Sequence, residues 1–465
     1  MQAISFVPFD QESRVQGKAD IWTQAPRGSN GQYSFSTPVK VQGRVGMAYK
    51  AYDLLNGAGN HCGINYARLF LDGELIHSLS LDRFSFDETR YINVHMDYKR
   101  YKARQGRHQR AYIQPGNLFS AYGRGKAQGL IRLTDTDIHR LRLELEDVHG
   151  NESVFTTDIV ADTTPDTIPE FRSSGKPAFT FTQIRDHLQL KVRRPLPSYR
   201  DGLTVEYEGG FTETWRPSYY ADGQLVFQFP LARYRYPNRV FDQEGHLDKA
   251  FHFQDEISAG RNNIVLLNEL ELFFPMGSLY DRIHLEVEQK DGYSGMLSDR
   301  FVVGRKEEPV FKPYLVSFKA GSSDVDRSKW IVVKRDGSEW EYIGSTMGED
   351  DNVYATIREF GEFALMADTV APSLRPITFS NGSYIGRNQT RMVLFSEDKL
   401  SGFAHTDYRI TLDDKWVPFG YDYKKNTLTY RWDAKTRPAP GTHTLHVQVA
   451  DKTGNIRERS YKVRF

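Results

Sequence analysis

A basic, aromatic segment between about residues 82 and 126 holds the residue types best suited to ligand chemistry. Six Lys and Arg residues fall between Lys99 and Arg110 with no acidic residue among them, and tyrosines are interleaved. Guanidinium groups bind carboxylate or phosphate through paired hydrogen bonds, and aromatic faces stack on flat or apolar ligand surfaces. The candidate binding residues are Arg90, Tyr91, Tyr98, Arg100, Tyr101, Arg107, Arg110 and Tyr112. They indicate a glycan or peptide with acidic groups; the alternative is a solvated loop or a docking surface for a neighbouring domain.

Sequence patterns of known catalytic sites are missing. The 13 histidines include no His-x-His and no His-Glu-x-x-His, so no zinc-ligand spacing is present. The sequence also has no Gly-x-Ser-x-Gly elbow, no phosphate-binding Gly-x-x-x-x-Gly-Lys and no dinucleotide fingerprint. We therefore expect no catalytic residue, no metal and no cofactor in this chain. A glycosidase-like pair of carboxylates is the remaining enzymatic alternative, and the acidic residues that can be placed lie in turns.

Four of these turn aspartates, at positions 53, 147, 398 and 451, have two interpretations. Clustered carboxylate oxygens are the ligands that calcium prefers, so the turns could hold a cation at the end of a domain. Alternatively, each carboxylate accepts hydrogen bonds from the backbone of its own turn. The second interpretation is favoured because these residues lie in sequences typical of turns.

Composition limits the protein class. The chain has 465 residues, a net charge of +1, 26% charged and 13% aromatic residues, which indicates a globular protein and disfavours a nucleic-acid partner. Cys62 is the single cysteine, so no intrachain disulfide can form. No run of 18 apolar residues and no signal peptide is visible.

Turn sequences near the two ends of the chain repeat in the same order, and the second set begins at Glu397. An opening turn, a hairpin and a closing turn occur at 53–57, 71–73 and 147–151, and again at 397–402, 412–414 and 451–455. Apolar residues alternate with polar ones before each closing turn, which is the period of a half-buried strand. We therefore expect two copies of one antiparallel sandwich, one at each end.

The predicted fold class is all-β, with several tandem antiparallel Ig-like β-sandwich domains, because Asp-Gly hairpin signals are dense and helical periodicity is scarce. The first copy exceeds the last by a long, partly helical insert at about 82–126. Asp-Thr and proline residues near 162–165 and 368–372 mark linkers. The predicted domains are 1–163 with the insert, 164–307, 308–368, which could be continuous with the previous one, and 369–465.

Several strings resemble the region downstream of the catalytic domain in large M23-family metallopeptidases of Bacteroidota. They are Tyr52 to Asn60, Phe84 to Asn93, Gln109-Arg110 with Pro115-Gly116-Asn117, Gly277 to Asp281, Phe360-Gly361 leading to Asp368-Thr369, and Trp416-Val417 before Tyr421-Asp422. The resemblance covers essentially the whole chain. The string from Phe86 to Asn93 is its most specific part.

The resemblance implies a non-catalytic accessory or spacer region in the cell envelope, in the periplasm or at the cell surface. In that family an upstream zinc domain cuts peptidoglycan cross-links; its motifs are absent here, so zinc is expected only in that domain and Met1 would be a truncated start. The implied partners are peptidoglycan or an envelope protein, and the upstream catalytic domain. The alternative is a stand-alone surface adhesin or glycan-binding protein.

Overall fold

The chain folds into four β domains in a computed structural model, which describes residues 1–54, 61–123, 125–164, 167–172, 175–319, 321 and 323–465. Domain 1 spans 1–161, domain 2 178–251, domain 3 253–367 and domain 4 373–465. Each has its own buried apolar core. Fully burying one such side chain contributes about 1.5–3 kcal/mol, so each core can hold its own pair of sheets together. The predicted all-β, Ig-like sandwich class is confirmed.

Domain 1 consists of two facing sheets. One has the order β12 (Gln109–Arg110), β7 (Val45–Lys50), β1 (Ala3–Pro8), β3 (Trp22–Gln24). The other has the order β11 (Glu74–Ser80), β10 (Tyr66–Leu71), β13 (His139–Glu146), β14 (Glu152–Ala161), β5 (Gln32–Ser34), β4 (Arg27–Ser29), with β6 (Val39–Gln42) beside β14 and β2 (Arg14–Val15) beside β6. A separate pair joins β8 (Asp53–Leu54) to β9 (His61–Cys62).

Domain 4 repeats the strand order of one sheet of domain 1. Its sheets are β34 (Ser373–Pro376), β35 (Arg391–Glu397), β39 (Thr427–Arg431), β38 (Gly420–Asp422), and β37 (Lys415–Trp416), β36 (Phe403–Leu412), β40 (Thr442–Asp451), β41 (Ile456–Arg464). Within its sheet, the strand order β37-β36-β40-β41 of domain 4 corresponds to the order β11-β10-β13-β14 of domain 1. The predicted repeat at both ends is therefore confirmed for this sheet; the opening turn predicted at 53–57 lies partly outside the described residues.

The repeat extends to individual hydrogen bonds at the hairpin. In domain 1 the Asp72 carboxylate lies 2.7 Å from His139 Nδ1 and accepts the Arg140 N–H at 2.7 Å. In domain 4 the Asp413 carboxylate lies 2.6 Å from His443 Nδ1 and accepts the Thr444 N–H at 2.8 Å. An aspartate in the turn and a histidine on the neighbouring strand thus make the same contacts in both hairpins.

Domains 2 and 3 are also sandwiches. Domain 2 contains β15 (Ala178–Ile184), β16 (His187–Arg193), β20 (Gln224–Pro230), β19 (Tyr219–Ala221), and β18 (Thr212–Trp215), β17 (Leu203–Tyr207), β21 (Pro237–Phe241), β22 (Asp248–Ala250), with short 3-10 turns η3 (Pro197–Arg200) and η4 (Glu208–Gly210). Domain 3 contains β23 (Phe253–Ile257), β26 (Ile283–Lys290), β27 (Arg300–Val303), β33 (Gly361–Ala367), β29 (Trp330–Asp336), β30 (Glu339–Gly344), and β24 (Asn263–Leu266), β25 (Leu270–Phe274), β28 (Pro309–Phe318), β32 (Val353–Glu359), β31 (Thr346–Met347), with η5 (Arg327–Lys329).

The domain division differs from the expected one at a single boundary. The expected division at 307/308 falls inside domain 3, because β27 before it pairs with β33 after it and both contribute to one core. The change of domain lies instead near residue 252, between β22 and β23. The expectation that 308–368 could be continuous with the preceding unit agrees with this pairing.

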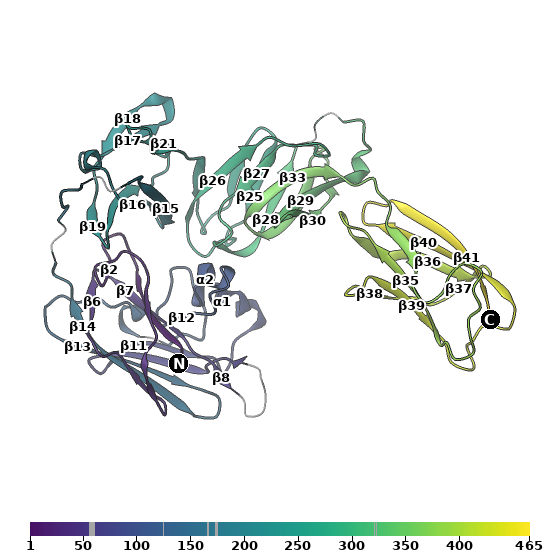
Figure 1. The fold of residues 1–465 in the computed structure, drawn as a ribbon, viewed down its shortest axis with the longest axis horizontal. Helices are drawn as coiled ribbons and strands as arrows, with labels where there is room; N and C mark the ends of the chain where they lie inside the picture. The colour runs from purple at the N-terminus through teal and green to yellow at the C-terminus, as the bar shows by residue number, and fades with distance from the viewer. Residues whose placement is uncertain (55–60, 124, 165–166, 173–174, 320, 322) are drawn as a thin grey trace.

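The insert of domain 1 carries the α-helices of the described chain. It contains η1 (Phe86–Tyr91), α1 (Ile92–His95) and α2 (Tyr98–Lys102), and a further 3-10 turn, η2 (Lys126–Gly129), follows. In Figure 1 these helices lie between domains 1 and 3. Within the described residues, no helix has the length and apolar character needed to cross a membrane.

Candidate functional site

The insert is fixed locally by two acidic side chains at helix starts. Glu88 accepts hydrogen bonds from the backbone N–H of Ser85 at 3.1 Å and of Ser120 at 2.9 Å, so it joins η1 to a distant loop. Asp97 accepts from the Arg100 N–H at 3.2 Å and caps α2. These contacts give a short basic helix a defined position, although isolated helices of this length are unstable in water.

Three of the eight candidate binding residues have side chains that are buried or hydrogen-bonded within domain 1. The Arg100 guanidinium donates to the hydroxyls of Ser5 at 3.0 Å and Thr23 at 2.8 Å. Arg110 donates to two backbone carbonyls, at 2.9 and 2.6 Å, and to the Tyr112 hydroxyl at 3.1 Å. Tyr112 is 0% exposed. Burial lowers the pKa of the Arg100 guanidinium, and the charge of the nearby Asp97 carboxylate opposes that shift.

Three other candidates face domain 3. Tyr91 stacks on Phe311 with ring centres 4.8 Å apart, and the Arg90 carbonyl accepts the Tyr280 hydroxyl at 2.5 Å. Tyr98 lies beside a cavity of about 410 Å³ that residues of domains 1, 2 and 3 line together. The structure therefore contains the docking surface that the sequence left as an alternative for this segment.

Gly116 packs directly against the backbone of domain 3 at Tyr280. An ideal Cβ built on Gly116 would lie 1.5 Å from the carbonyl oxygen of Tyr280, and its φ is +72°. Only glycine therefore fits this position without moving one of the two segments. Two strings that carried the sequence resemblance, 115–117 and 277–281, meet here. The resemblance identified both strings, but no sequence pattern predicted that they are in contact.

The last two candidates, Tyr101 and Arg107, remain at the surface and line one shallow cavity of about 490 Å³. We call it the Tyr101 hollow; its lining residues are Tyr52, Cys62, Gly63, Tyr101, Arg104, Gly106, Arg107 and Gln109. Tyr101 is 40% exposed, and the Arg107 guanidinium lies 5.8 Å from the centre of its ring. No acidic side chain is among these lining residues.

The Tyr101 hollow combines a stacking surface with cations. The exposed Tyr101 ring offers an apolar face and Tyr52 lines the same cavity, while Arg104 and Arg107 can each bind a carboxylate through two parallel hydrogen bonds. Arg104 belongs to the basic run of the sequence. Tyr52, which follows the end of β7, begins one of the strings that carry the resemblance, but it was not among the candidate binding residues. Whether the eight candidates bind a ligand stays a prediction, and the geometry concentrates it on Tyr101 and Arg107.

The three domains that surround the insert contact one another in pairs. Domain 1 meets domain 2 where Lys18 lies 3.1 Å from Asp222. Domain 2 meets domain 3 where Tyr236 stacks on Phe253 at 5.1 Å and its hydroxyl lies 2.9 Å from His284 Nδ1. With the docking of the insert, domains 1, 2 and 3 close a ring of contacts that holds the basic helix in place.

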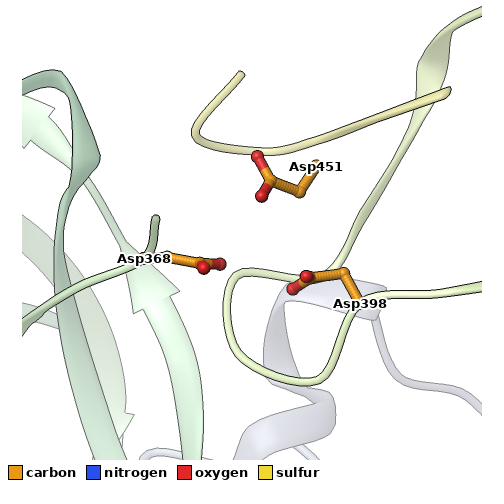
Figure 2. A group of neighbouring side chains, drawn as sticks. All are labelled: Asp368, Asp398 and Asp451. Carbon is orange, nitrogen blue, oxygen red and sulfur yellow. The ribbon is translucent and has the colours of Figure 1, made fainter. Parts of the chain in front are cut away.

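A second cluster lies where domain 3 joins domain 4. Asp368, Asp398 and Asp451 each place a carboxylate oxygen within 4.8 Å of the others, and Figure 2 shows the three groups converging. Burial raises the pKa of Asp398, and the charges of the other two carboxylates raise it further.

The hydrogen bonds of this cluster match the turn-cap interpretation. Asp398 Oδ1 accepts the Gly402 N–H at 2.8 Å, and Asp451 Oδ1 accepts the Asn455 N–H at 2.8 Å. Asp368 Oδ2 accepts the Ser401 N–H at 3.0 Å, so it also joins the linker to domain 4. Asp147 caps its own turn as Asp451 does. The calcium alternative is untested by these contacts. Of the four aspartates that the sequence marked, Asp398 and Asp451 belong to the cluster, whereas Asp53 in β8 and Asp147 do not.

Comparison with known proteins gives one family match. A family model described as the Zu5-like domain matches residues 255–368, which is nearly the span of domain 3. No curated protein sequence matches the chain.

Three solved structures show weak similarity. A surface glycan-binding protein, SGBP-B, from the mixed-linkage glucan utilization locus of Bacteroides ovatus, solved with a heptasaccharide, has 10% identity and a TM-score of 0.13 over 86% of this chain and 59% of that one. A Ca²⁺-stabilized ice-binding adhesin of an Antarctic bacterium has 10% identity and a TM-score of 0.14 over 90% and 92%. The human Desmocollin-1 ectodomain has 11% identity and a TM-score of 0.15 over 74% and 68%. Similarities of this size carry no functional conclusion.

Proposed function

We propose that this chain is a non-catalytic binding protein of the cell envelope, and that the Tyr101 hollow binds an acidic glycan. The observation that carries the proposal is the hollow itself, in which two tyrosines and two arginines line one surface and none of the described lining residues is acidic. Sugar rings pack against tyrosine faces, and uronic acid carboxylates suit paired guanidinium donors. An envelope location comes from the sequence resemblance and is part of the proposal.

The docked insert supports this function because it keeps the hollow in one arrangement. A ligand surface on a flexible loop loses affinity when the loop must be ordered on binding. Here Arg100 and Arg110 anchor the two ends of the basic run inside domain 1. The exposed residues between them, including Tyr101 and Arg107, are therefore preorganised.

The test is binding of oligogalacturonate to the purified chain by calorimetry, with neutral dextran as the comparison ligand. Tyr101→Ala and Arg107→Gln are each expected to weaken oligogalacturonate binding about three- to tenfold, because each removes one stacking or charged contact. Arg391→Gln, which removes an exposed charge in domain 4, is the matched control and should bind as the unaltered chain does. Equal affinity for dextran, or no effect of either hollow variant, would contradict the proposal, as would binding of acidic peptides alone.

A second function, the accessory region of an M23-type peptidoglycan metallopeptidase, has its own supporting observation. The strings that carry the resemblance, 84–93, 115–117 and 277–281, come together at the contact between the insert and domain 3. A spacer that positions an attached hydrolase needs such a rigid joint. In this function the chain alone should contain no stoichiometric zinc and release no muropeptides from peptidoglycan. Near-equimolar zinc together with cleavage would refute it.

A further inference from the structure

A second basic surface lies on the other side of α2, where the helix faces domain 3. This cavity of about 450 Å³, which we call the α2 groove, has walls from both domains. The insert contributes Lys99, Lys102 and Ala103, and domain 3 contributes Lys306, Glu307, Lys334, Arg335, Asp336, Glu359 and Phe360. Five basic and three acidic side chains therefore line it.

The acidic side chains do not neutralise the α2 groove. Glu359 is shared, since its carboxylate lies 3.0 Å from Lys334 Nζ and 3.6 Å from Lys102 Nζ. Lys99 and Lys306 are exposed, and neither forms an ion pair with a described residue. The groove thus keeps an excess of positive charge.

The groove exists only while the insert is docked. Its lysines come from positions about 200 residues apart in the chain, and they are brought together by the contacts of Tyr91 and Gly116 with domain 3. Like charges that line one cavity repel one another, so the lysines of the α2 groove oppose docking. An anion in the groove removes this repulsion and so favours the docked arrangement.

We propose that the α2 groove is a second anion subsite, which binds a further carboxylate of the same acidic glycan as the Tyr101 hollow. The proposal rests on the proposed function, because the ligand class is taken from the hollow. Both cavities use residues of the α2 segment: Tyr101 and Arg104 on one side, Lys99 and Lys102 on the other. A helix with its side chains is about 10–12 Å across, so the ligand must be an oligosaccharide long enough to cross it.

The two subsites predict a dependence on ligand length. A galacturonate monomer can occupy only one subsite, whereas a long oligogalacturonate occupies both, and linked contacts raise affinity beyond that of either alone. The double variant Lys99→Gln/Lys306→Gln should lower oligogalacturonate affinity about three- to tenfold and leave affinity for the monomer in the hollow unchanged. Lys415→Gln/Lys435→Gln, which removes two exposed lysines of domain 4, is the matched control.

Calorimetry on the full chain with monomer, short and long oligogalacturonate separates the outcomes. Loss of the length dependence in the groove variant, with folding checked by thermal unfolding, supports the second subsite. If Tyr101→Ala weakens binding but the groove variant does not, the hollow stands and the second subsite is overturned. If neither variant weakens binding, the proposed function fails as well. Preference for polyphosphate over oligogalacturonate would overturn the assignment of a carboxylate ligand.

Discussion

Replacing Gly116 by alanine should release the insert from domain 3 while leaving both domains folded. The added Cβ would lie 1.5 Å from the Tyr280 carbonyl oxygen, whereas non-bonded heavy atoms prefer about 3.5 Å, so the segments must separate by about 2 Å. A separation of that size breaks the 2.5 Å hydrogen bond from the Tyr280 hydroxyl to the Arg90 carbonyl. It also disrupts the stacking of Tyr91 on Phe311.

The magnitude follows from these two contacts. A hydrogen bond of this kind contributes about 1 kcal/mol and an aromatic pair about 1 kcal/mol. Loss of both weakens docking by about 2 kcal/mol, which is roughly a 30-fold change in the docking equilibrium. Alanine at positive φ adds about 1–2 kcal/mol of backbone strain. Gly73→Ala carries the same strain without the clash, because Gly73 has φ +83° and no atom within 4 Å of an added Cβ.

Hydrogen exchange measured by mass spectrometry distinguishes the two variants. In Gly116→Ala the amides of residues 86–95 and 277–281 should exchange faster than in the unaltered chain, by up to about 30-fold. In Gly73→Ala the same amides should keep their protection, although its melting temperature falls. Equal protection of these segments in both variants would show that Gly116 does not control docking.

Three further predictions concern buried charge and the division of the basic run. His77 is buried with neither ring nitrogen hydrogen-bonded within the described residues, and burial lowers its pKa to about 3. The free energy of unfolding should therefore fall as the pH drops below about 6.5, by about 3 kcal/mol at pH 4. His77→Leu should flatten that decline in acid unfolding curves. A flat curve for the unaltered chain would refute this. The raised pKa of Asp398 means that the folded state takes up a proton more readily than the unfolded state, so acidification stabilises the fold. Asp398→Asn should keep the hydrogen bonds of the turn, lose this pH dependence and cost no stability at pH 7 in chemical denaturation. A clear loss of stability at pH 7, or a stabilisation by Ca²⁺ that the variant abolishes, would favour the cation alternative. Of the two arginines, only Arg100 is held by internal hydrogen bonds. In the same assay, Arg100→Gln should therefore lower the unfolding free energy by about 1–3 kcal/mol and Arg107→Gln by less than about 0.5 kcal/mol. Equal effects would contradict the assignment of Arg100 to the interior and Arg107 to the surface.

The repeated sandwich was predictable because its signals are local. A turn such as Asp147 to Asn151 specifies its own hydrogen bonds, and the same residue types at Asp451 to Asn455 make the same ones. Strand alternation next to these turns then sets which face is buried. Hairpin signals were slightly less reliable. The Asp-Gly pairs at 72, 222 and 336 form short turns between paired strands, and the pair at 291 lies in the longer loop between the paired strands β26 and β27, but the pair at 201 joins no such hairpin.

Local sequence patterns did not predict which strands pair or which arginines are buried. Alternation shows that Phe301 and Phe363 are each buried, but it does not show that β27 pairs with β33, so the boundary near 307 was misplaced. In the insert the chain is irregular, and no period separates Arg100, which points inward, from Arg107, which stays exposed. Residue type predicted an anion-binding segment, and only the tertiary contacts show which cations remain available.

The joint between the insert and domain 3 shows why an interface of this kind leaves so little trace in a sequence. One of its close approaches is made by Gly116, which has no side chain, against the backbone carbonyl of Tyr280. The hydroxyl of Tyr280 in turn donates to the carbonyl of Arg90 and not to its charged group. Backbone oxygens are the same for every residue type, so the partners carry no complementary pattern. Because the α2 groove is built on this joint, its positive charge depends on two residues whose types indicate nothing about charge.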